Sequence, residues 1–366
     1  MLCQPGPRLR GEGVGNDALA ARGRYNRAML APRDRLGRPL TDLRVSVTDR
    51  CSLRCGFCMP GDREYEFLSR TELLSYEETA RLVHVFAGLG VTKVRLTGGE
   101  PLLRRDLHRL VALLAATPGI DDLALTTNGL LLARDASALR EAGLARVTVS
   151  LHSLRPETFD RLSGSRGHLP EVLAGIEAAS AAGLAPVKVN AVVMRGVNDD
   201  EVAELARFFK RPGFVLRFIE YMDVGTVNGW QPGGVVTAEE IVARVGAELP
   251  IEPAPRCNAH DVALRFRYRD GEGELGVIAS VSRPFCGDCS RARLTADGQL
   301  FACLFAATGL DLKTPLRAGE SDDDLAERIA AFWGARTDRY SEERAERIAA
   351  GHGVPEPRVE MYRIGG

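Results

Sequence analysis

The stretch Asp42-Leu-Arg-Val-Ser-Val-Thr-Asp-Arg-Cys-Ser-Leu-Arg-Cys-Gly-Phe-Cys58 joins a strand-like run to three closely spaced cysteines. Apolar and polar residues alternate from Leu43 to Val47, which is typical of a β-strand with two unlike faces. The cysteines follow at once, so they lie in the loop that leaves the carboxyl end of this strand. Functional sites of parallel α/β folds gather at such ends, and this stretch therefore predicts both the fold class and the site.

The same order of strand and helix repeats along the chain, which predicts a parallel sheet with right-handed crossovers. Six such units fit either a doubly wound sheet or an incomplete barrel. The predicted strands are Leu43–Val47, Val94–Leu96, Leu123–Thr126, Val147–Leu151, Val187–Val193 and Leu216–Glu220, and the helical patterns between them include Tyr76–Gly88, Leu107–Ala116, Pro170–Ala181 and Asp200–Phe209.

Polar residues recur on one face of these strands, where a sheet covered by helices on both sides would be apolar. The opposite face of each strand is apolar. This pattern favours an incomplete (β/α)6 barrel of the TIM type with a polar lumen, although charges on misregistered or edge strands would give a similar pattern. The polar sets are Arg44, Ser46 and Thr48; Arg95 and Thr97; Thr148, Ser150 and His152; and Lys188 and Asn190.

The chain divides into three parts by composition. Residues 1–38 are rich in Gly, Pro and Arg and predict a flexible N-terminal extension. Residues 39–250 form the predicted partial barrel, and residues 251–366 form a C-terminal extension. This extension holds a predicted hairpin, Val262–Arg269 with Leu275–Ile278, an acidic helical stretch over residues 319–330, and an extended end that finishes in Gly365-Gly366.

Composition excludes several classes of protein. The 366 residues are 45% hydrophobic and 27% charged, as in a soluble globular protein. The formal net charge of −1 gives no overall basic field for nucleic acid. No apolar run reaches the roughly 18 residues of a membrane span, and the N-terminus lacks a secretory signal, so we expect a cytoplasmic protein.

The eight cysteines favour metal binding over disulfides, since six of them form two tight groups in a long chain without a signal. Cys51, Cys55 and Cys58 form the first trio. Three thiolates leave a tetrahedral zinc ion or a four-iron cluster one ligand short, so the site has either a distant fourth ligand or an open position.

The second trio comprises Cys286, Cys289 and, thirteen residues later, Cys303. These three cysteines would suit a zinc ion if a further residue such as Cys257 supplied the fourth ligand. Cys3 and Cys257 otherwise stand outside both groups, and we expect both to be ordinary thiols.

The first trio, with an aromatic residue before its third cysteine, resembles the radical S-adenosylmethionine (SAM) superfamily. Thr97-Gly98-Gly99-Glu100-Pro101 is similar to that superfamily's site for the amino group of SAM. The second trio with Ser290-Arg-Ala-Arg293, and the ending Met361-Tyr-Arg-Ile-Gly-Gly366, resemble the GTP 3′,8-cyclase family. Further stretches that agree with this family lie at residues 42–50, 126–129, 188–190, 194–199, 218–222 and 338–341.

The resemblance implies two [4Fe–4S] clusters, one on each trio, each with one open iron, and SAM as a further cofactor. It implies that Phe57 through its backbone, Gly99, Ser150 and Met222 bind SAM, with Phe57 replacing the expected tyrosine. His152 stands where the family usually has an acid, which puts a charge-dependent role of this position in doubt. For GTP the implied residues are Arg44, Arg95, Thr126, Lys188, Arg291, Ala292 and Arg293. Ion pairs of Arg44 or Arg95 with Asp49 or Glu100 are the alternative for those two arginines.

The implied reaction takes hydrogen from C3′ of GTP and joins that carbon to C8, giving (8S)-3′,8-cyclo-7,8-dihydroguanosine 5′-triphosphate at the start of molybdenum cofactor biosynthesis. The Gly365-Gly366 tail is expected in the active site. Implied partners are a flavodoxin-type or ferredoxin-type electron donor and the cyclic pyranopterin monophosphate synthase that receives the product, with the enzyme a monomer or homodimer. Another radical SAM enzyme with an auxiliary cluster, or a zinc-binding interaction protein, are the competing hypotheses.

Overall fold

The computed structural model describes residues 31–257, 261–350 and 358–365. A single twelve-stranded sheet runs through it in the order β12-β11-β10-β1-β2-β3-β4-β5-β6-β9-β8-β7. The strands are β1 (Asp42–Ser46), β2 (Lys93–Thr97), β3 (Asp122–Thr127), β4 (Arg146–Ser150), β5 (Val187–Val193), β6 (Phe214–Glu220), β7 (Ile251–Ala254), β8 (Leu264–Tyr268), β9 (Glu274–Ile278), β10 (Arg291–Leu294), β11 (Gln299–Phe301) and β12 (Leu310–Asp311).

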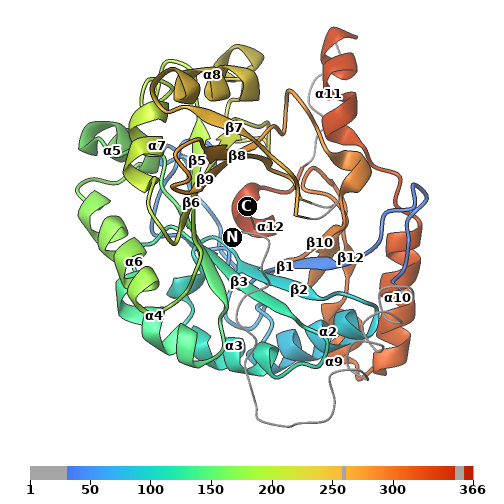
Figure 1. Ribbon diagram of the computed structural model, residues 1–366. Coiled ribbons are helices and arrows are strands. Elements are labelled where there is room, and N and C mark those ends of the chain that lie inside the picture. Colours follow the sequence, from blue (N-terminus) through green and yellow to red (C-terminus); the bar gives the residue numbers. More distant parts are fainter. Residues whose placement is uncertain (1–30, 258–260, 351–357, 366) are drawn as a thin grey trace.

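Strands β1 to β6 are parallel and follow one another in chain order. The sheet curves into a ring, and the helices that connect its strands lie on the outer side (Figure 1). The helices are α2 (Tyr76–Gly88), α3 (Leu107–Ala115), α4 (Leu132–Glu141), α5 (Pro156–Ser163), α6 (Leu169–Ala181), α7 (Val202–Phe209), α8 (Ala238–Glu248), α9 (Lys313–Arg317), α10 (Asp322–Gly334), α11 (Tyr340–Ala349) and α12 (Met361–Ile364), with short 3₁₀ turns η1 (Pro101–Leu103), η2 (Pro232–Gly234) and η3 (Cys286–Asp288).

The predicted α/β fold is confirmed, and its core lies between the sheet and the outer helices. On β1 the apolar residues Leu43 and Val45 are fully buried, and Leu82 and Phe86 of α2 belong to the same core. Helix α2 begins at a capping box, in which the Ser75 hydroxyl accepts from the N–H of Glu78 and the Glu78 carboxylate accepts from the N–H of Ser75. The apolar face of the strands therefore packs against the helices, and the polar face lies on the inside of the ring.

Residues after 250 add strands to both edges of the same sheet. Strand β9 pairs parallel with β6 and continues into the antiparallel strands β8 and β7. Strand β10 pairs parallel with β1 at the other edge and continues into β11 and β12. The predicted hairpin corresponds to β8 and β9. The C-terminal third of the chain therefore extends the sheet on both sides of the six consecutive strands.

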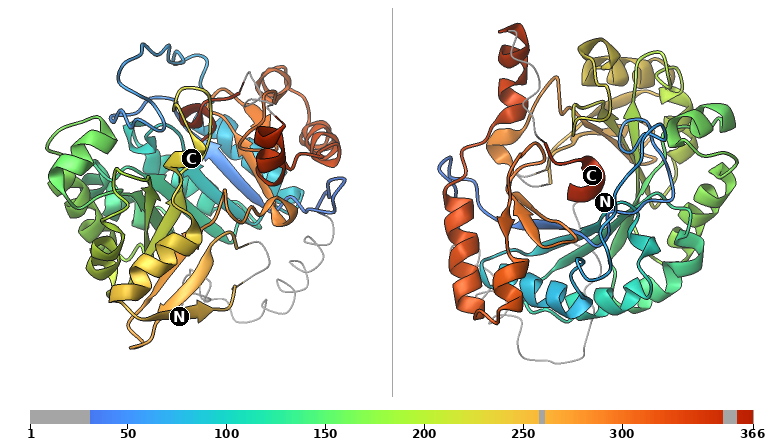
Figure 2. Two further views of the ribbon diagram at one scale, coloured as in Figure 1. Left: turned by 90° about the horizontal axis from the view of Figure 1, so that it is seen from above. Right: turned by 180° about the vertical axis from the view of Figure 1, so that it is seen from behind.

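Two local predictions need correction. Residues 31–38 are part of the folded body rather than of a flexible extension, since Asp34 and Arg38 are 6% and 2% exposed; residues 1–30 lie outside the described part. The end of the chain is not extended throughout, because Met361–Ile364 forms the helical turn α12. Figure 1 and the right-hand view of Figure 2 place α12 within the ring.

Among the described residues, no helix has the length and apolar character that crossing a membrane requires.

Candidate active site

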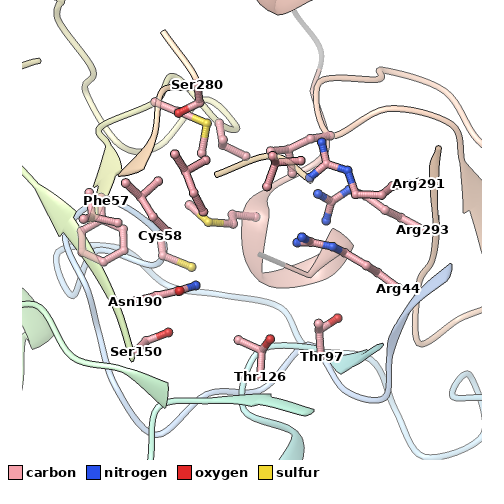
Figure 3. A pocket seen from close by; sticks show the side chains of 18 of the residues that line it. Arg44, Phe57, Cys58, Thr97, Thr126, Ser150, Asn190, Ser280, Arg291 and Arg293 are labelled. Atoms are coloured by element: carbon pink, nitrogen blue, oxygen red, sulfur yellow. The ribbon is translucent and has the colours of Figure 1, made fainter. Parts of the chain in front are cut away.

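A cavity of about 290 Å³ lies inside the ring, at the carboxyl ends of the parallel strands. All six cysteines of the two predicted trios line it. Figure 3 shows Phe57 and Cys58 on one side of the cavity and Arg44, Arg291 and Arg293 on the opposite side. Thiols and guanidinium groups that are far apart in the sequence thus surround one shared space.

The first cysteine loop, which follows β1, is held by its own backbone. The N–H of Cys58 donates to the carbonyl oxygen of Cys55 over 2.9 Å, and the guanidinium of Arg54 donates to the carbonyl oxygen of Cys51 over 2.9 Å. None of these three cysteines is in a disulfide. Burial raises the pKa of Cys55 to about 12, so its thiolate needs a compensating cation. This set of donors fits a soft metal centre such as an iron–sulfur cluster.

The loop after β2 packs closely against the segment that leads to the first cysteine. The N–H of Gly99 donates to the carbonyl oxygen of Thr48 over 2.7 Å. A Cβ atom on Gly99 would lie 2.3 Å from the carbonyl oxygen of Arg50, and one on Gly98 would lie 2.5 Å from that of Thr48. Only glycine permits this approach, so the two glycines fix how the loop presents its backbone to the cavity.

Glu100 anchors the next loop rather than pairing with an arginine. Its buried carboxylate accepts hydrogen bonds from the N–H groups of Leu102 and Asn128 and from the hydroxyl of Thr127, at 2.7–3.0 Å. Burial raises its pKa to about 7. Asp49 in turn accepts from the N–H of Leu68. The carboxylates proposed as alternative ion-pair partners of the arginines are therefore engaged elsewhere.

The four residues expected to bind SAM line the cavity together: Phe57, Gly99, Ser150 and Met222. His152 also lines it and packs edge-on against Phe57 with 5.0 Å between ring centroids. Its Nδ1 atom accepts from the N–H of Val192 over 3.1 Å. Burial lowers the pKa of His152 to about 4, so the ring is neutral near pH 7 and carries none of the charge of an acid at this position.

The arginines opposite come from neighbouring strands. Arg44 of β1 is in register with Arg95 of β2 and with Arg293 of β10. Burial, reinforced by the positive charges of Arg293, Arg291 and Arg95, holds the pKa of Arg44 well below its usual range. The Nε atom of Arg44 is buried without a hydrogen-bond partner among the described residues. Asp42 is a nearby carboxylate whose charge attracts these arginines. The cations still outnumber it, and such an excess of buried positive charge favours an anionic ligand.

Arg95 is held by hydroxyl groups instead of carboxylates. Its guanidinium donates to the hydroxyl of Thr126 over 3.3 Å and to that of Thr148 over 3.1 Å. These neutral partners hold the side chain in the lumen without neutralising its charge. A bound anion can therefore use that charge fully.

The second trio lies on two loops beside β10 and β11. The N–H of Phe305 donates to the sulfur of Cys303 over 3.5 Å, and Arg291 donates to the sulfur of Cys289 over 3.6 Å. Although burial raises the pKa of Cys289, Arg291 and Arg336 outweigh it and bring the pKa to about 6. This thiol is therefore ready to bind a metal as its thiolate near neutral pH.

The C-terminal tail enters the ring and reaches the inner face of the strands. Ile364 is fully buried, and Arg293 donates a hydrogen bond to the carbonyl oxygen of Gly365. Gly365 has φ of +76°, and a Cβ atom there would lie 2.1 Å from the hydroxyl oxygen of Thr97. The tail thus ends between β1, β2 and β10, where no larger residue fits; Gly366 lies outside the described residues.

Comparisons with known proteins match this geometry. Residues 45–209 match the family model of the Radical SAM superfamily, and residues 214–342 match the model described as Molybdenum Cofactor Synthesis C. A protein of Acidothermus cellulolyticus named GTP 3′,8-cyclase is 56% identical over 320 residues, which cover 86% of this chain and 88% of that protein. This chain belongs to the GTP 3′,8-cyclase family.

A second relative has the same name, and one solved structure has a similar fold. The GTP 3′,8-cyclase of Aquifex aeolicus is 48% identical over 333 residues, covering 91% of this chain and 99% of that protein. The crystal structure of Streptococcus suis SuiB bound to S-adenosylmethionine has a TM-score of 0.55 at 15% identity, covering 88% of this chain and 75% of that one, and this likeness shows the fold alone. As a radical SAM enzyme, this family member uses SAM and an iron–sulfur cluster. The competing hypotheses of a zinc-binding interaction protein and of a different radical SAM enzyme are not favoured.

Two of the residues expected to bind GTP do not line the cavity of this GTP 3′,8-cyclase family member. Lys188 shares a face of β5 with Asn190, which does line it, but lies two residues nearer the start of the strand. Burial and the nearby charges of Arg217 and Arg146 lower its pKa to about 6. Ala292 is fully buried in the core, so only its backbone, between Arg291 and Arg293, is near the site.

Arg217 lines the cavity but was not identified from the sequence. Arg217 of β6 donates from Nε to the side-chain oxygen of Asn190 over 2.9 Å, and both line the cavity. The signal was available, because Arg217 interrupts the apolar run Leu216-Arg-Phe218 with the same period of two. Thr97, which the sequence placed on the polar strand face, and Asn128 also line the cavity.

Cys257 is not a ligand at this site. It does not line the cavity. Cys3 lies outside the described residues.

Proposed function

We propose that this chain converts GTP to (8S)-3′,8-cyclo-7,8-dihydroguanosine 5′-triphosphate, the first step of molybdenum cofactor biosynthesis. The observation that carries the proposal is that both cysteine trios and the cluster of buried arginines line one cavity. A reaction between a radical source and a bound nucleotide needs both in a single water-poor space. The shared cavity supplies that space.

Each trio suits three corners of a [4Fe–4S] cluster with one iron left open. In this proposal Cys51, Cys55 and Cys58 hold the cluster that binds SAM, and Cys286, Cys289 and Cys303 hold the cluster that binds the guanine of GTP. When bound, the clusters and SAM would supply the radical and the electrons that the reaction needs. The protein's own residues bind, orient and shield the reactants.

SAM would lie on the side of the cavity formed by Phe57 and Ser150. Gly99 offers backbone to the amino group, because the loop after β2 cannot carry a side chain there. Phe57 is 8% exposed and its ring packs against His152, so the side chain is held in place and the Phe57 backbone is proposed to contact SAM. Met222, in the loop after β6, completes this side.

GTP would lie against the opposite side. Arg44, Arg95, Arg291 and Arg293 offer forked donors for the triphosphate, and an anion there relieves the mutual repulsion of these buried cations. Thr126 and the backbone at Ala292 are further proposed contacts. Lys188 would contribute its charge from lower in the lumen, at the height of Thr148.

The tail would complete the site. Gly365 lies against Thr97 and Ser46, so the chain end narrows the lumen beside the arginines. We assign to Gly365 and Gly366 the exclusion of water and the placement of GTP, with no acid or base role.

The proposal includes the wider arrangement. Residues 39–250 form an incomplete (β/α)6 barrel of the radical SAM type, and residues 251–366 carry the second cluster. The enzyme would be cytoplasmic, as a monomer or homodimer, without nucleic acid or membrane partners. It would take electrons from a flavodoxin-type or ferredoxin-type donor and pass its product to cyclic pyranopterin monophosphate synthase.

Anaerobic reconstitution followed by a nucleotide panel tests the proposed function. Two clusters give about eight irons per chain. Incubation with SAM, dithionite and GTP is expected to give 5′-deoxyadenosine together with a cyclised nucleotide, whereas ATP, CTP or UTP gives no cyclised nucleotide. Cyclisation of another nucleotide in preference to GTP, or brown protein that forms no nucleotide product, would contradict the proposal.

A further inference from the structure

A short segment before β1 is folded around one buried carboxylate. Asp34 accepts hydrogen bonds from the N–H groups of Leu36 and Arg38, each over 2.9 Å, and from the Nε of Arg38. The side chains of Asp34 and Arg38 are 0% and 1% exposed. This segment, residues 31–38, is the blue loop beside α10 in Figure 1, and the indole of Trp333 in α10 donates to the carbonyl oxygen of Arg38 over 3.0 Å.

The segment reaches the second cysteine trio through Arg38. One terminal nitrogen of its guanidinium donates to the carbonyl oxygen of Cys286 and to that of Asp338, each over 2.9 Å. These residues are 248 and 300 positions away in the chain. A rigid fork that bonds a carboxylate on one side and two carbonyls on the other fixes all three relative to one another.

Arg336 makes a similar backbone contact to the next cysteine of the second trio, Cys289. It donates to the carbonyl oxygen of Cys289 over 2.8 Å and, from Nε, to the carboxylate of Asp338 over 2.9 Å. Its guanidinium lies 3.8 Å from the same Asp34 carboxylate and 4.7 Å from the ring centre of Trp333. Two buried arginines that share one aspartate thus each bond the backbone of one cysteine ligand.

We propose that Arg38 and Arg336, joined by Asp34, are positioning residues that hold the Cys286–Cys289 loop in the geometry that binds the second cluster. Residues that fix the orientation of metal ligands without touching the metal commonly set how tightly it is held. The segment before β1 would therefore be part of the second metal site, although it lies at the opposite end of the sequence. This inference rests on the proposed second cluster.

Site-resolved loss of iron tests the inference. Reconstituted wild type, Arg38→Gln and Arg336→Gln would be challenged with a chelator, pulsed with iodoacetamide and digested, and alkylation of each cysteine peptide measured by mass spectrometry. We expect Cys286 and Cys289 to become reactive about 10–100-fold faster in the variants than in wild type. Cys51, Cys55 and Cys58 should keep their wild-type rates.

Arg54→Gln is the matched control, because Arg54 makes the same kind of bond to the carbonyl oxygen of Cys51. It should expose the first trio and leave the second protected. Equal exposure of both trios in Arg38→Gln and Arg336→Gln, or exposure of neither, would overturn the inference. If the glutamine variants do not fold, Arg38→Lys and Arg336→Lys carry the same expectation, since lysine keeps the charge but loses the fork. A wild type whose second trio is labelled at once would instead refute the proposed second cluster.

Discussion

Arg293 donates a hydrogen bond to the carbonyl oxygen of Gly365, the next-to-last residue of the chain. Arg293 is 3% exposed and belongs to β10, two residues after the start of that strand. The contact joins β10, the strand beside the second trio, to the C-terminal tail inside the ring. An arginine proposed to bind GTP therefore also fixes the chain end, so tail position and substrate binding depend on each other.

Gly365→Ala should abolish most product formation while leaving the clusters in place. The new Cβ would lie 2.1 Å from the hydroxyl oxygen of Thr97, and φ of +76° is strained for alanine. Displacement of the tail by even about 1 Å is expected to lower cyclisation about a hundredfold. Iron content, 5′-deoxyadenosine and cyclised nucleotide should be measured on one preparation.

Gly319→Ala is the control, because Gly319 has φ of +85° but no atom within 4 Å of the added Cβ. It should retain product formation. A variant ending at Ile364 should behave as Gly365→Ala does. Full product formation by either tail variant would refute the role of the tail.

Arg44→Gln should stabilise the ligand-free protein and weaken GTP binding. The substitution removes a buried cation that is repelled by Arg293, Arg291 and Arg95. It also removes a charge-assisted hydrogen bond to the nucleotide, which is worth about 1.5–3 kcal/mol, or about 10–150-fold in affinity. Thermal unfolding without ligand and calorimetric titration with GTP measure the two effects.

Arg207→Gln provides the comparison, since Arg207 makes only an exposed ion pair with Glu248. We expect it to change neither quantity. A lower unfolding temperature for Arg44→Gln than for wild type would mean that Arg44 stabilises the fold, and unchanged GTP affinity would remove it from the site.

Lys188 should make stability rise with pH. Its pKa is lowered from 10.5 in the unfolded chain to about 6 in the folded protein, by burial and then by the charges of Arg217 and Arg146. Between those values the unfolded chain binds one more proton than the folded protein, so this residue makes the free energy of unfolding increase with pH. Urea unfolding at pH 6.5 and pH 9 should show a smaller increase for Lys188→Met than for wild type. An equal increase would contradict the shifted pKa.

The same lysine predicts proton uptake on nucleotide binding. A triphosphate in the lumen favours the charged form of Lys188, so wild type should take up a proton when it binds GTP at pH 7.5. Calorimetry in buffers with different ionisation enthalpies measures this uptake. Lys188→Met should show less of it, and identical uptake in the two proteins would place the nucleotide away from Lys188.

Local pattern predicted the central strands and one face of the site. Strand β5 and helix α2 have the predicted bounds, because their periodicities of two and 3.6 residues are set by burial against immediate neighbours. The same alternation placed Arg44 and Arg95 on the polar face. The alternation could not predict how far along the lumen each side chain lies. For this reason Lys188 was expected in the cavity, although it lies below it.

Contacts between segments that are far apart in the sequence leave no periodic pattern in it. The parallel pairing of β10 with β1, and the bonds from Arg38 to the second trio, join residues about 250 positions apart. The tail was expected to be extended, yet Tyr362 and Ile364 are buried and Met361–Ile364 forms a helical turn. The cysteine spacings still predicted six residues that line one cavity, since the spacing of residues within a loop is local.

Isotope transfer tests the central claim, that one cavity brings SAM and GTP together for cyclisation. GTP deuterated at C3′ would be incubated anaerobically with reconstituted enzyme, SAM and dithionite, and 5′-deoxyadenosine analysed by mass spectrometry. The account predicts one deuterium in the 5′-deoxyadenosine formed, in step with cyclised nucleotide. It also predicts that Cys286→Ser loses both transfer and product while still binding SAM. Unlabelled 5′-deoxyadenosine alongside full cyclisation, or normal transfer in Cys286→Ser, would contradict it.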